Sequence, residues 1–480
     1  MSSIHSMQIF EAEEMKMGRM VEEIKKIGSI AGPMVGVILL FYLLQIISMM
    51  MVGHLGSQLI LSATALAFSC CSVFGFNVLL GMAGALETLC GQAYGAEQYQ
   101  KLGIYTYTAI ISLALVSLPL SLIWIFMGKL LPLMHQDPSI SQAAGKFSRC
   151  FIPALFGYAV FQPLVRFFQT QSLIMPLLIS SVLTFCIHIP FCWLLVFKSS
   201  LGYLGAAFAL DISIWLNILF LGLFMRYSVA CAKTRATVSI EVLMEIPRVL
   251  RLAVPSTLML CLEYWSFELV VILAGLLPNP KLETSVLALS LTTTGTVYAI
   301  PYAIGAAAST RVSNELGAGN PQGAQVAVQG AILMAFADAV LFSSALLAGR
   351  RFFGLMFSKN KQVVEYFTTI SPLVATTVAL DAFQGVLTGI ARGCGWQKLG
   401  TYINIGAYYL IGIPISVVLG FVLHLKGKGL WSGILVGAAL QNIGLSILTT
   451  NMNWDKQAMK AKARTCDGLE MERQSSEVVI

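Results

Sequence analysis

The sequence predicts an all-α membrane protein whose twelve transmembrane helices form two pseudo-symmetric six-helix lobes. Three observations predict this fold: an apolar composition, a series of long apolar stretches and an internal repeat. The chain of 480 residues is 57% hydrophobic and 11% charged, whereas a soluble globular domain carries about 25% charged residues. Its mean hydropathy of +0.79 is typical of a chain that crosses the membrane many times.

Apolar stretches recur along the chain at the length that a bilayer requires. A transmembrane helix needs roughly 20 apolar residues to cross the hydrocarbon core. Residues 1–28 are polar and charged, and the first apolar stretch has full spanning length, so we predict no cleavable signal peptide. The predicted spans are residues 29–52, 60–90, 99–127, 147–168, 173–197, 203–227, 250–276, 285–310, 324–348, 364–390, 399–423 and 430–450.

The second half of the chain repeats the first. Phe161-Gln162 recurs as Phe383-Gln384, 222 residues later. A period near half the chain length indicates two copies of one helical bundle, as in transporters that bind their ligands near the membrane midplane. The other matched pairs are Pro33 and Pro255 at 222 residues, and Gly81 and Gly305, Gly95 and Gly319, and Pro190 and Pro414 at 224 residues.

These patterns divide the chain into five segments. Residues 1–28 form an N-terminal segment, 29–228 an N-lobe with spans one to six, 229–247 a linker, 248–452 a C-lobe with spans seven to twelve, and 453–480 a polar tail. Lys and Arg gather before the first span, in the linker and after the last span. The positive-inside rule therefore predicts that the N-terminal segment, the linker and the tail are all cytoplasmic.

Two carboxylates lie in apolar spans of the second repeat. At the positions of Glu263 and Asp381 the first repeat has Phe41 and Ala159. Charge at the bilayer centre costs on the order of 3 kcal/mol, so both acids must face protein or water. Two acids in one low-dielectric cavity cannot both ionise cheaply, so they take up a proton or hold a cation. The alternative is that each acid merely forms hydrogen bonds between neighbouring helices.

Further polar and aromatic residues are candidates for lining a substrate cavity. Glu268 lies five residues after Glu263 and therefore faces another side of the same helix. Tyrosine rings offer π faces to a cationic ligand, although core packing explains each of them equally well. These cavity candidates are Glu268, Asn77, Gln45, Tyr264, Gln384 and Tyr298.

Several spans contain proline, which removes a backbone donor and bends a helix. Pro33, Pro255 and Pro372 are the positions at which we expect bending during transport. Three more ionisable residues in spans remain open candidates for carrying a proton, His188, Asp211 and Asp338. For His188, a hydrogen-bonded core histidine is the more common interpretation.

Other function classes lack their sequence signatures. The chain has no G-x-x-x-x-G-K-[ST] loop and no soluble domain that could hold one. Neither a Ser-His-Asp arrangement nor a metal-ligand spacing is present. The ten cysteines include no C-x-x-C motif, so they act as small hydrophobes. We therefore predict no enzyme activity, no metal, no cofactor and no nucleic-acid partner.

Several motifs match those of one family in order and spacing, over about residues 25–450. The chain resembles the plant multidrug and toxic compound extrusion transporters, known as MATE or DETOXIFICATION proteins. The motifs are MVGHLG (Met51–Gly56), ALETLCGQAYGA (Ala85–Ala96), FQTQS (Phe168–Ser172), CLEYW and FELV around Glu263 and Glu268, RVSNELGAGNP (Arg311–Pro321) and GIARGCGWQKLG (Gly389–Gly400).

The resemblance implies an antiporter that exports organic solutes against incoming protons. It places the proton site of the eukaryotic family on Glu263 and Asp381, and a further family acid on Glu268. Archaeal and some bacterial relatives carry an essential Asp on the first helix, where this chain has Ser48. A proton site in the N-lobe is therefore not expected. Some bacterial members use the second-lobe acids for sodium, so the coupling ion is H⁺ by expectation, with Na⁺ still open.

The expected partners are small organic substrates, cationic or amphipathic, together with protons and the lipid bilayer. We expect a monomer in the plasma membrane, with the vacuolar membrane as the alternative. A lipid or lipid-linked headgroup flippase is another function for a two-lobed bundle. A flippase needs basic residues deep in its spans to bind phosphate, and the sequence indicates only Arg166 there. A sensor or scaffold without transport is the third alternative.

Overall fold

The computed structural model describes residues 2–133, 136–237, 239–357 and 360–465, and every regular element in these ranges is helical. Within these ranges eleven helices are long and apolar enough to cross a membrane. A further bent pair, Pro138–Cys150 with Ile152–Thr170, brings the number to twelve when it is counted as one span. This confirms the predicted all-α membrane fold.

The described chain forms two compact units. The N-terminal unit comprises Pro33–Cys261, and the C-terminal unit comprises the residues up to Gly32 together with those from Leu262 onward. The chain changes unit inside two continuous helices, α1 (Ser2–Gly53) and α11 (Ile246–Ala274). The predicted N-terminal segment and first span are thus one helix, which continues through Gly28, Gly32 and Pro33.

The N-terminal unit contains a broken span. Helices α6 and α7 meet at Phe151 with a bend of 48°. Asp137 caps α6, because its carboxylate accepts hydrogen bonds from the backbone N–H of Ser139 at 2.8 Å and of Ile140 at 3.1 Å. The elements are α2 (Gln58–Cys71), η1 (Ser72–Phe76), α3 (Asn77–Ala83), α4 (Ala85–Gly95), α5 (Tyr99–Leu133), α6 (Pro138–Cys150), α7 (Ile152–Thr170), α8 (Ile174–Trp193), η2 (Leu194–Lys198), α9 (Leu204–Tyr227), η3 (Val229–Cys231) and α10 (Glu241–Met244).

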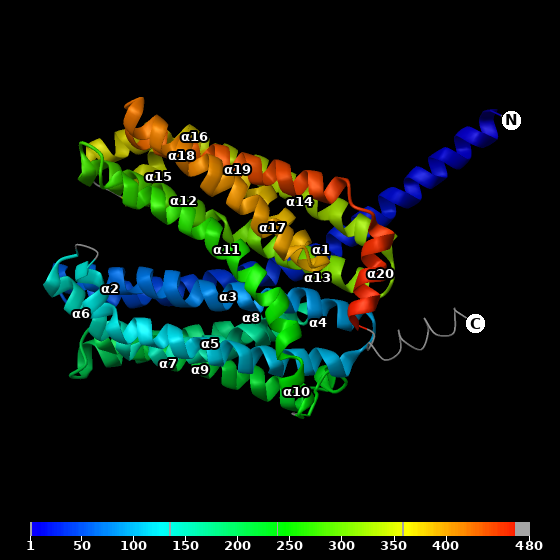
Figure 1. The fold of residues 1–480 in the computed structure, drawn as a ribbon, viewed down its shortest axis with the longest axis horizontal. Helices are drawn as coiled ribbons and strands as arrows, with labels where there is room; N and C mark the ends of the chain where they lie inside the picture. Colours follow the sequence, from blue (N-terminus) through cyan, green and yellow to red (C-terminus); the bar gives the residue numbers. More distant parts are fainter. Residues whose placement is uncertain (1, 134–135, 238, 358–359, 466–480) are drawn as a thin grey trace. The chain divides into compact units, whose positions relative to one another are not determined.

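The C-terminal unit holds the second repeat (Figure 1). Its core is a cluster of buried side chains from α11, α12, α14, α16, η4 and α19, which includes Phe367, Tyr408 and Trp431. The elements are α12 (Pro280–Val297), α13 (Ala299–Gly317), α14 (Pro321–Ala348), α15 (Arg350–Phe357), α16 (Lys361–Cys394), α17 (Gln397–Asn404), η4 (Ile405–Gly412), α18 (Ile413–Val417), η5 (Val418–Val422), α19 (Lys426–Thr450) and α20 (Trp454–Thr465).

Glycines let α13 and α16 cross in backbone contact. A Cβ added at Gly389 would overlap the backbone of Gly305, and one added at Gly305 would overlap the carbonyl of Gly385. The spacing of Gly385 and Gly389 places both on one face of α16. Small residues at this spacing allow close helix packing within membranes. This crossing sets the relative position of the side chains that α13 and α16 contribute to the site below.

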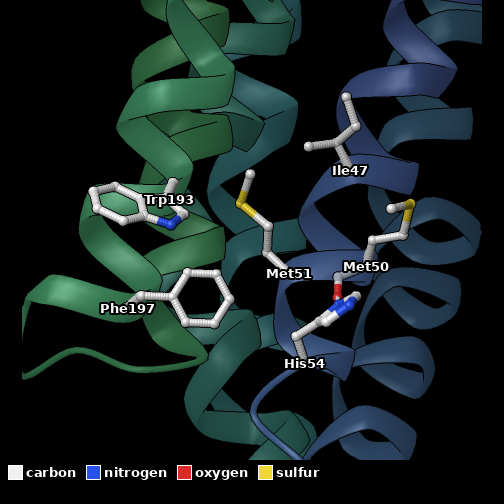
Figure 2. Close-up of a pocket in the computed structure, with 6 residues that line it drawn as sticks. All are labelled: Ile47, Met50, Met51, His54, Trp193 and Phe197. Carbon is white, nitrogen blue, oxygen red and sulfur yellow. Dashed lines mark hydrogen bonds between the residues drawn. The ribbon is translucent and has the colours of Figure 1, made fainter.

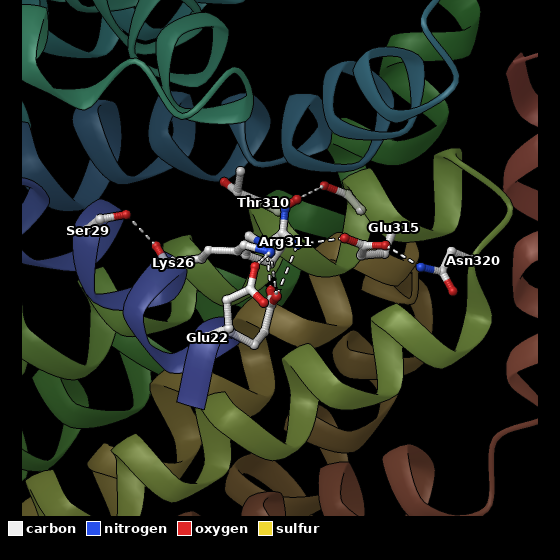
Figure 3. Close-up of polar contacts among 9 residues, drawn as sticks. Glu22, Lys26, Ser29, Thr310, Arg311, Glu315 and Asn320 are labelled. Carbon is white, nitrogen blue, oxygen red and sulfur yellow. Dashed lines mark hydrogen bonds and ion pairs between the residues drawn. The ribbon is translucent and has the colours of Figure 1, made fainter. Parts of the chain in front are cut away.

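The first part of α1 is anchored to the C-terminal unit by an ion-pair network (Figure 3). Arg311 of α13 donates hydrogen bonds to both oxygens of Glu23, from Nε at 2.5 Å and from Nη2 at 3.2 Å. The same Nη2 donates to Glu315 at 2.6 Å, and Asn320 donates to the other oxygen of Glu315 at 2.8 Å. These contacts explain why residues before Gly32 group with the second repeat.

The predicted polar tail contains a short helix. Figure 1 shows α20 turned away from the axis of α19, across the end of the C-terminal unit. Its Trp454 ring packs against Trp396 at 6.0 Å, and Arg464 donates to the carbonyl of Cys394 at 3.1 Å. Tertiary contacts therefore order residues that look like a simple solvated tail in sequence. The remainder of the predicted tail, 466–480, lies outside the described residues.

Candidate functional site

Glu263 is the centre of a hydrogen-bond network inside the C-terminal unit. It lies on α11, a continuous helix that has no glycine between Pro255 and its last residue, Ala274. Its Oε2 accepts hydrogen bonds from Nε2 of Gln384 at 2.7 Å and from Nε2 of Gln441 at 3.0 Å. These amides come from α16 and α19, so one carboxylate joins three helices. Hydrogen bonds to an ionised group are stronger than neutral ones.

Two tyrosines orient the amides that contact Glu263. The hydroxyl of Tyr298 donates to Oε1 of Gln384 at 3.0 Å, and that of Tyr408 donates to Oε1 of Gln441 at 2.8 Å. With its oxygen occupied in this way, each amide turns its N–H₂ group toward the carboxylate. The network therefore presents donors to Glu263 from both sides. It continues through Thr388, 3.1 Å from Nε2 of Gln384, and Asn404, 2.9 Å from Nε2 of Gln441.

Irregular helix geometry places both tyrosines. Tyr298 lies at the break between α12 and α13. Pro301 causes this break, because it has no N–H to donate to the carbonyl of Val297. Tyr408 lies in the π-helical turn η4, and such turns frequently occur at functional sites.

Asp381 lies one helical turn before Gln384 on α16 and is partly buried. It lies close enough to Glu263 for the two charges to interact. Tyr298 and Tyr408 also lie within electrostatic range of both carboxylates. The structure thus brings together four of the residues that the sequence singles out, Glu263, Asp381, Gln384 and Tyr298.

The other predicted cavity residues lie on α11 or in the N-terminal unit. Glu268 and Tyr264 are partly buried on α11, and no hydrogen bond links Glu268 to the network within the described part of the chain. Asn77 and Gln45 are partly buried in the N-terminal unit. The three prolines at which we expect bending, Pro33, Pro255 and Pro372, lie inside the uninterrupted helices α1, α11 and α16.

The open candidates differ in their surroundings. His188 is buried, and its ring nitrogens contact the hydroxyls of Ser48 at 3.1 Å and Ser213 at 2.8 Å, so it ties α1, α8 and α9 together. Asp211 is buried on α9 beside the backbone of Ala154, at the start of α7. Asp338 is buried on α14, and neither carboxylate oxygen has a hydrogen-bond partner among the described residues.

Two residues of the site, Arg392 and Gln441, were not predicted from the sequence. The tenth span was predicted to end at residue 390, so Arg392 fell just outside it. Helix α16 continues to Cys394, and Arg392 is 5% exposed in its last turn. The left-handed Gly395, with φ of 80°, is the C-terminal cap that marks the true end of the helix. Gln441 is a second site residue that was not predicted. A glutamine inside an apolar stretch is the sequence signal that could have identified it.

A separate pocket lies in the N-terminal unit (Figure 2). It has a volume of about 340 Å³, and Nδ1 of His54 contacts the carbonyl of Met50 at 2.8 Å at its edge. No carboxylate lines it, so it lacks the chemistry of the Glu263 network. The lining residues are Ile47, Met50, Met51, His54, Trp193 and Phe197.

The helical repeat and the membrane-embedded polar network define a multi-pass membrane transporter. The family model MatE matches residues 33–194 and again residues 255–418, so each half of the chain is one copy of the family domain. The chain belongs to the MATE family. It is accordingly an efflux transporter of small organic compounds, and not an enzyme.

Individual relatives agree with this assignment. The chain is 54% identical to Protein DETOXIFICATION 12 of Arabidopsis thaliana over 94% of both chains. It is 51% identical to Protein DETOXIFICATION 10 of the same plant, over 96% of this chain and 95% of the relative. The crystal structure of the eukaryotic MATE transporter AtDTX14 matches with a TM-score of 0.91 at 51% identity, covering 93% of this chain and all of that one.

Proposed function

We propose that this transporter is a proton-coupled antiporter that exports organic cations or other amphipathic compounds, with Glu263 and Asp381 as the coupling site. One observation carries the proposal: two carboxylates interact within the C-terminal unit, one of them held by two oriented amides. An acid inside the membrane is expensive. Such a pair is neutral only when both acids hold a proton, and each proton that it releases adds one negative charge.

The donors around Glu263 favour a proton over a sodium ion. Hard cations are bound by several oxygen ligands. Here Gln384 and Gln441 direct N–H groups at the carboxylate, while their oxygens are occupied by tyrosine hydroxyls. A cation at Oε2 would have to displace these donors. A proton needs a single oxygen and leaves the network in place.

The position of Glu263 along α11 suggests how proton binding acts on the conformation. Helix α11 changes unit between Cys261 and Leu262, next to Glu263. The two amides tie this point of α11 to α16 and α19. Protonation weakens these hydrogen bonds, because they are strongest to an ionised carboxylate. Proton and substrate then compete through the charge of the site, and each shifts the conformational equilibrium by its differential affinity.

Transport by reconstituted protein tests the coupling site. We expect uptake of the fluorescent cation ethidium into proteoliposomes under an imposed pH gradient, and none under a sodium gradient alone. Glu263→Gln and Asp381→Asn should each abolish this uptake while leaving the yield of folded protein unchanged. Ser48→Ala serves as the matched control in the N-terminal unit and should retain uptake. If both acid variants keep normal coupled uptake, the coupling site lies elsewhere.

The same assay separates the other interpretations. Sodium-driven uptake that depends on Glu263 would favour sodium coupling. A flippase would move a fluorescent phospholipid between leaflets and show no pH-driven uptake of ethidium. Arg392 does not favour the flippase, because its charge interacts with Glu263. A scaffold would show no transport at all.

We also propose an orientation, a membrane and an oligomeric state for this transporter. The clusters of Lys and Arg before the first span, in the linker and after the last span support cytoplasmic termini. We place the protein in the plasma membrane as a monomer, and epitope tags at either terminus with selective permeabilisation would test the orientation.

A further inference from the structure

A column of aromatic and polar side chains leads from Glu263 toward the end of α16. Gln384 joins Glu263 to the hydroxyl of Tyr298. The ring of Tyr298 contacts that of Tyr302, one turn further along α13, at 6.1 Å. The guanidinium of Arg392 then lies over the Tyr302 ring at 5.6 Å. All members of this column belong to the C-terminal unit.

Arg392 carries a permanent positive charge at a buried position, where an uncompensated charge is costly in free energy. Its side chain is 5% exposed within the spanning helix Lys361–Cys394. A guanidinium does not lose its proton in proteins, and a buried cation requires a compensating partner. The aromatic face of Tyr302 compensates in part through a cation–π contact. The charge of Arg392 also interacts with that of Glu263.

Glycine packing fixes the place of Arg392. Gly393 packs directly on the backbone of Ser309, where an added Cβ would lie 2.7 Å from its carbonyl oxygen. Gly389, one turn earlier, packs on Gly305 in the same way. Helix α16 therefore cannot rotate or slide on α13 without a backbone clash, which fixes the backbone of Arg392 relative to Tyr302.

We propose that Arg392 is the built-in counter-charge of the coupling site, which compensates one of the two carboxylates and leaves the site with a single charge to exchange. With both acids ionised the site carries one net negative charge, and a single proton or a single monovalent cation neutralises it. The inference rests on the proposed coupling function of Glu263 and Asp381. It narrows the substrate class to monovalent organic cations, because a divalent cation would leave an uncompensated positive charge.

Charged groups on the neighbouring helices have other partners or lie apart from Glu263. On α13, Arg311 pairs with Glu23 and Glu315. On α12, Glu283 accepts hydrogen bonds from Tyr366 at 2.7 Å and from the N–H of Gly427 at 3.0 Å. Other titratable groups on the elements packed around Glu263 include Arg248, Arg251, Cys261, Tyr264 and Glu268 on α11, Lys281 on α12, Asp338 on α14, Glu365 and Cys394 on α16, Tyr408 and Tyr409 on η4, and Lys426 and Lys428 on α19.

Replacement of Arg392 tests this inference through the pH dependence of transport. An opposite charge favours the ionised form of an acid, so its removal makes the acid bind its proton more tightly. Arg392→Gln should move the pH of half-maximal ethidium uptake upward by on the order of one unit. Arg392→Lys, which keeps the charge, should stay near the wild-type value. Lys398→Gln is the matched control, because it removes an exposed positive charge just beyond the end of α16.

Charge selectivity gives a second readout that a purely structural role would not move. The wild-type protein should take up monovalent tetraphenylphosphonium in preference to divalent methyl viologen. Arg392→Gln should raise the relative uptake of methyl viologen several-fold. If Arg392→Gln does not fold, Tyr302→Leu removes the aromatic support and should shift the pH profile in the same direction, while Tyr302→Phe should not.

Two results would overturn the inference. One is a pH profile of Arg392→Gln that superimposes on that of the wild type. The other is an unchanged preference between the two cations. The proposed coupling function is tested separately by Glu263→Gln: if that variant loses coupling and Arg392→Gln changes neither readout, only the counter-charge is refuted. If Glu263→Gln retains coupling, the proposed function itself fails.

Discussion

Gln384 donates a hydrogen bond to Glu263 at 2.7 Å, across the space between α16 and α11. This bond joins two residues that lie 121 positions apart in the chain. The amide is itself held by Tyr298, so its orientation is decided before the proton arrives or leaves.

The tyrosine hydroxyls should matter for coupling although they do not touch the carboxylate. Tyr298→Phe removes the donor that holds Oε1 of Gln384, and Tyr408→Phe does the same for Gln441. Loss of one such hydrogen bond costs about 1 kcal/mol. We expect each variant to fold and to lose several-fold in pH-driven ethidium uptake, less than Glu263→Gln does. Wild-type uptake in both variants would show that the amides need no orientation by tyrosine.

The glycine crossing of α13 and α16 should tolerate no side chain. Gly389→Ala places a methyl group against the backbone of Gly305, and such overpacking costs about 1–3 kcal/mol. We expect a lower melting temperature and a reduced folded yield in detergent. Gly295→Ala is the matched control on α12, because nothing lies within 4 Å of its added Cβ. An equal effect of both changes would argue against the tight crossing.

Glu23 should anchor the first part of α1. Glu23→Gln removes the negative charge and one of the two oxygens that bind Arg311, and both side chains are largely buried, at 9% exposure for Glu23 and 16% for Arg311. We expect a loss of stability of about 1–3 kcal/mol and faster hydrogen exchange over residues 17–32. Glu22→Gln is the control, since its exposed pair with Lys26 contributes little. Unchanged exchange in Glu23→Gln would mean that apolar packing alone holds this segment.

His188 should stabilise the N-terminal unit without carrying the coupling proton. Its contacts with Ser48 and Ser213 join three helices. His188→Ala should therefore lower the melting temperature, while the pH profile of ethidium uptake keeps its midpoint. A shifted midpoint would make His188 a proton carrier. Asp338→Asn should likewise retain coupling, because Asp338 lies outside the network of Glu263.

Parts of the site were predictable because polar residues are rare in membrane-spanning segments and can therefore be recognised in the sequence. Glu263 and Asp381 stand out in apolar spans, and the repeat shows that their counterparts are Phe41 and Ala159. Gln441 is also a polar residue in an apolar span, but it is uncharged and is therefore less easily recognised. Arg392 was missed because the predicted span ended too early, although Gly395 marks the true helix end. His188 stood out for the same reason as the acids, and the structure shows that serine hydroxyls contact both of its ring nitrogens.

The sequence by itself determined the class of fold, the number of spans and the half of the chain that carries the acids. Composition and periodicity are properties of each segment, so they can be recognised without knowing what each segment contacts. Tertiary structure alone decided that Gln384, Gln441 and Tyr298 meet at Glu263, and that Arg392 stacks on Tyr302. These contacts depend on helix crossings set by glycine packing and on breaks at Tyr298 and η4. Such geometry arises only when helices distant in sequence pack against one another, because each contact is a property of a pair of surfaces and not of either segment.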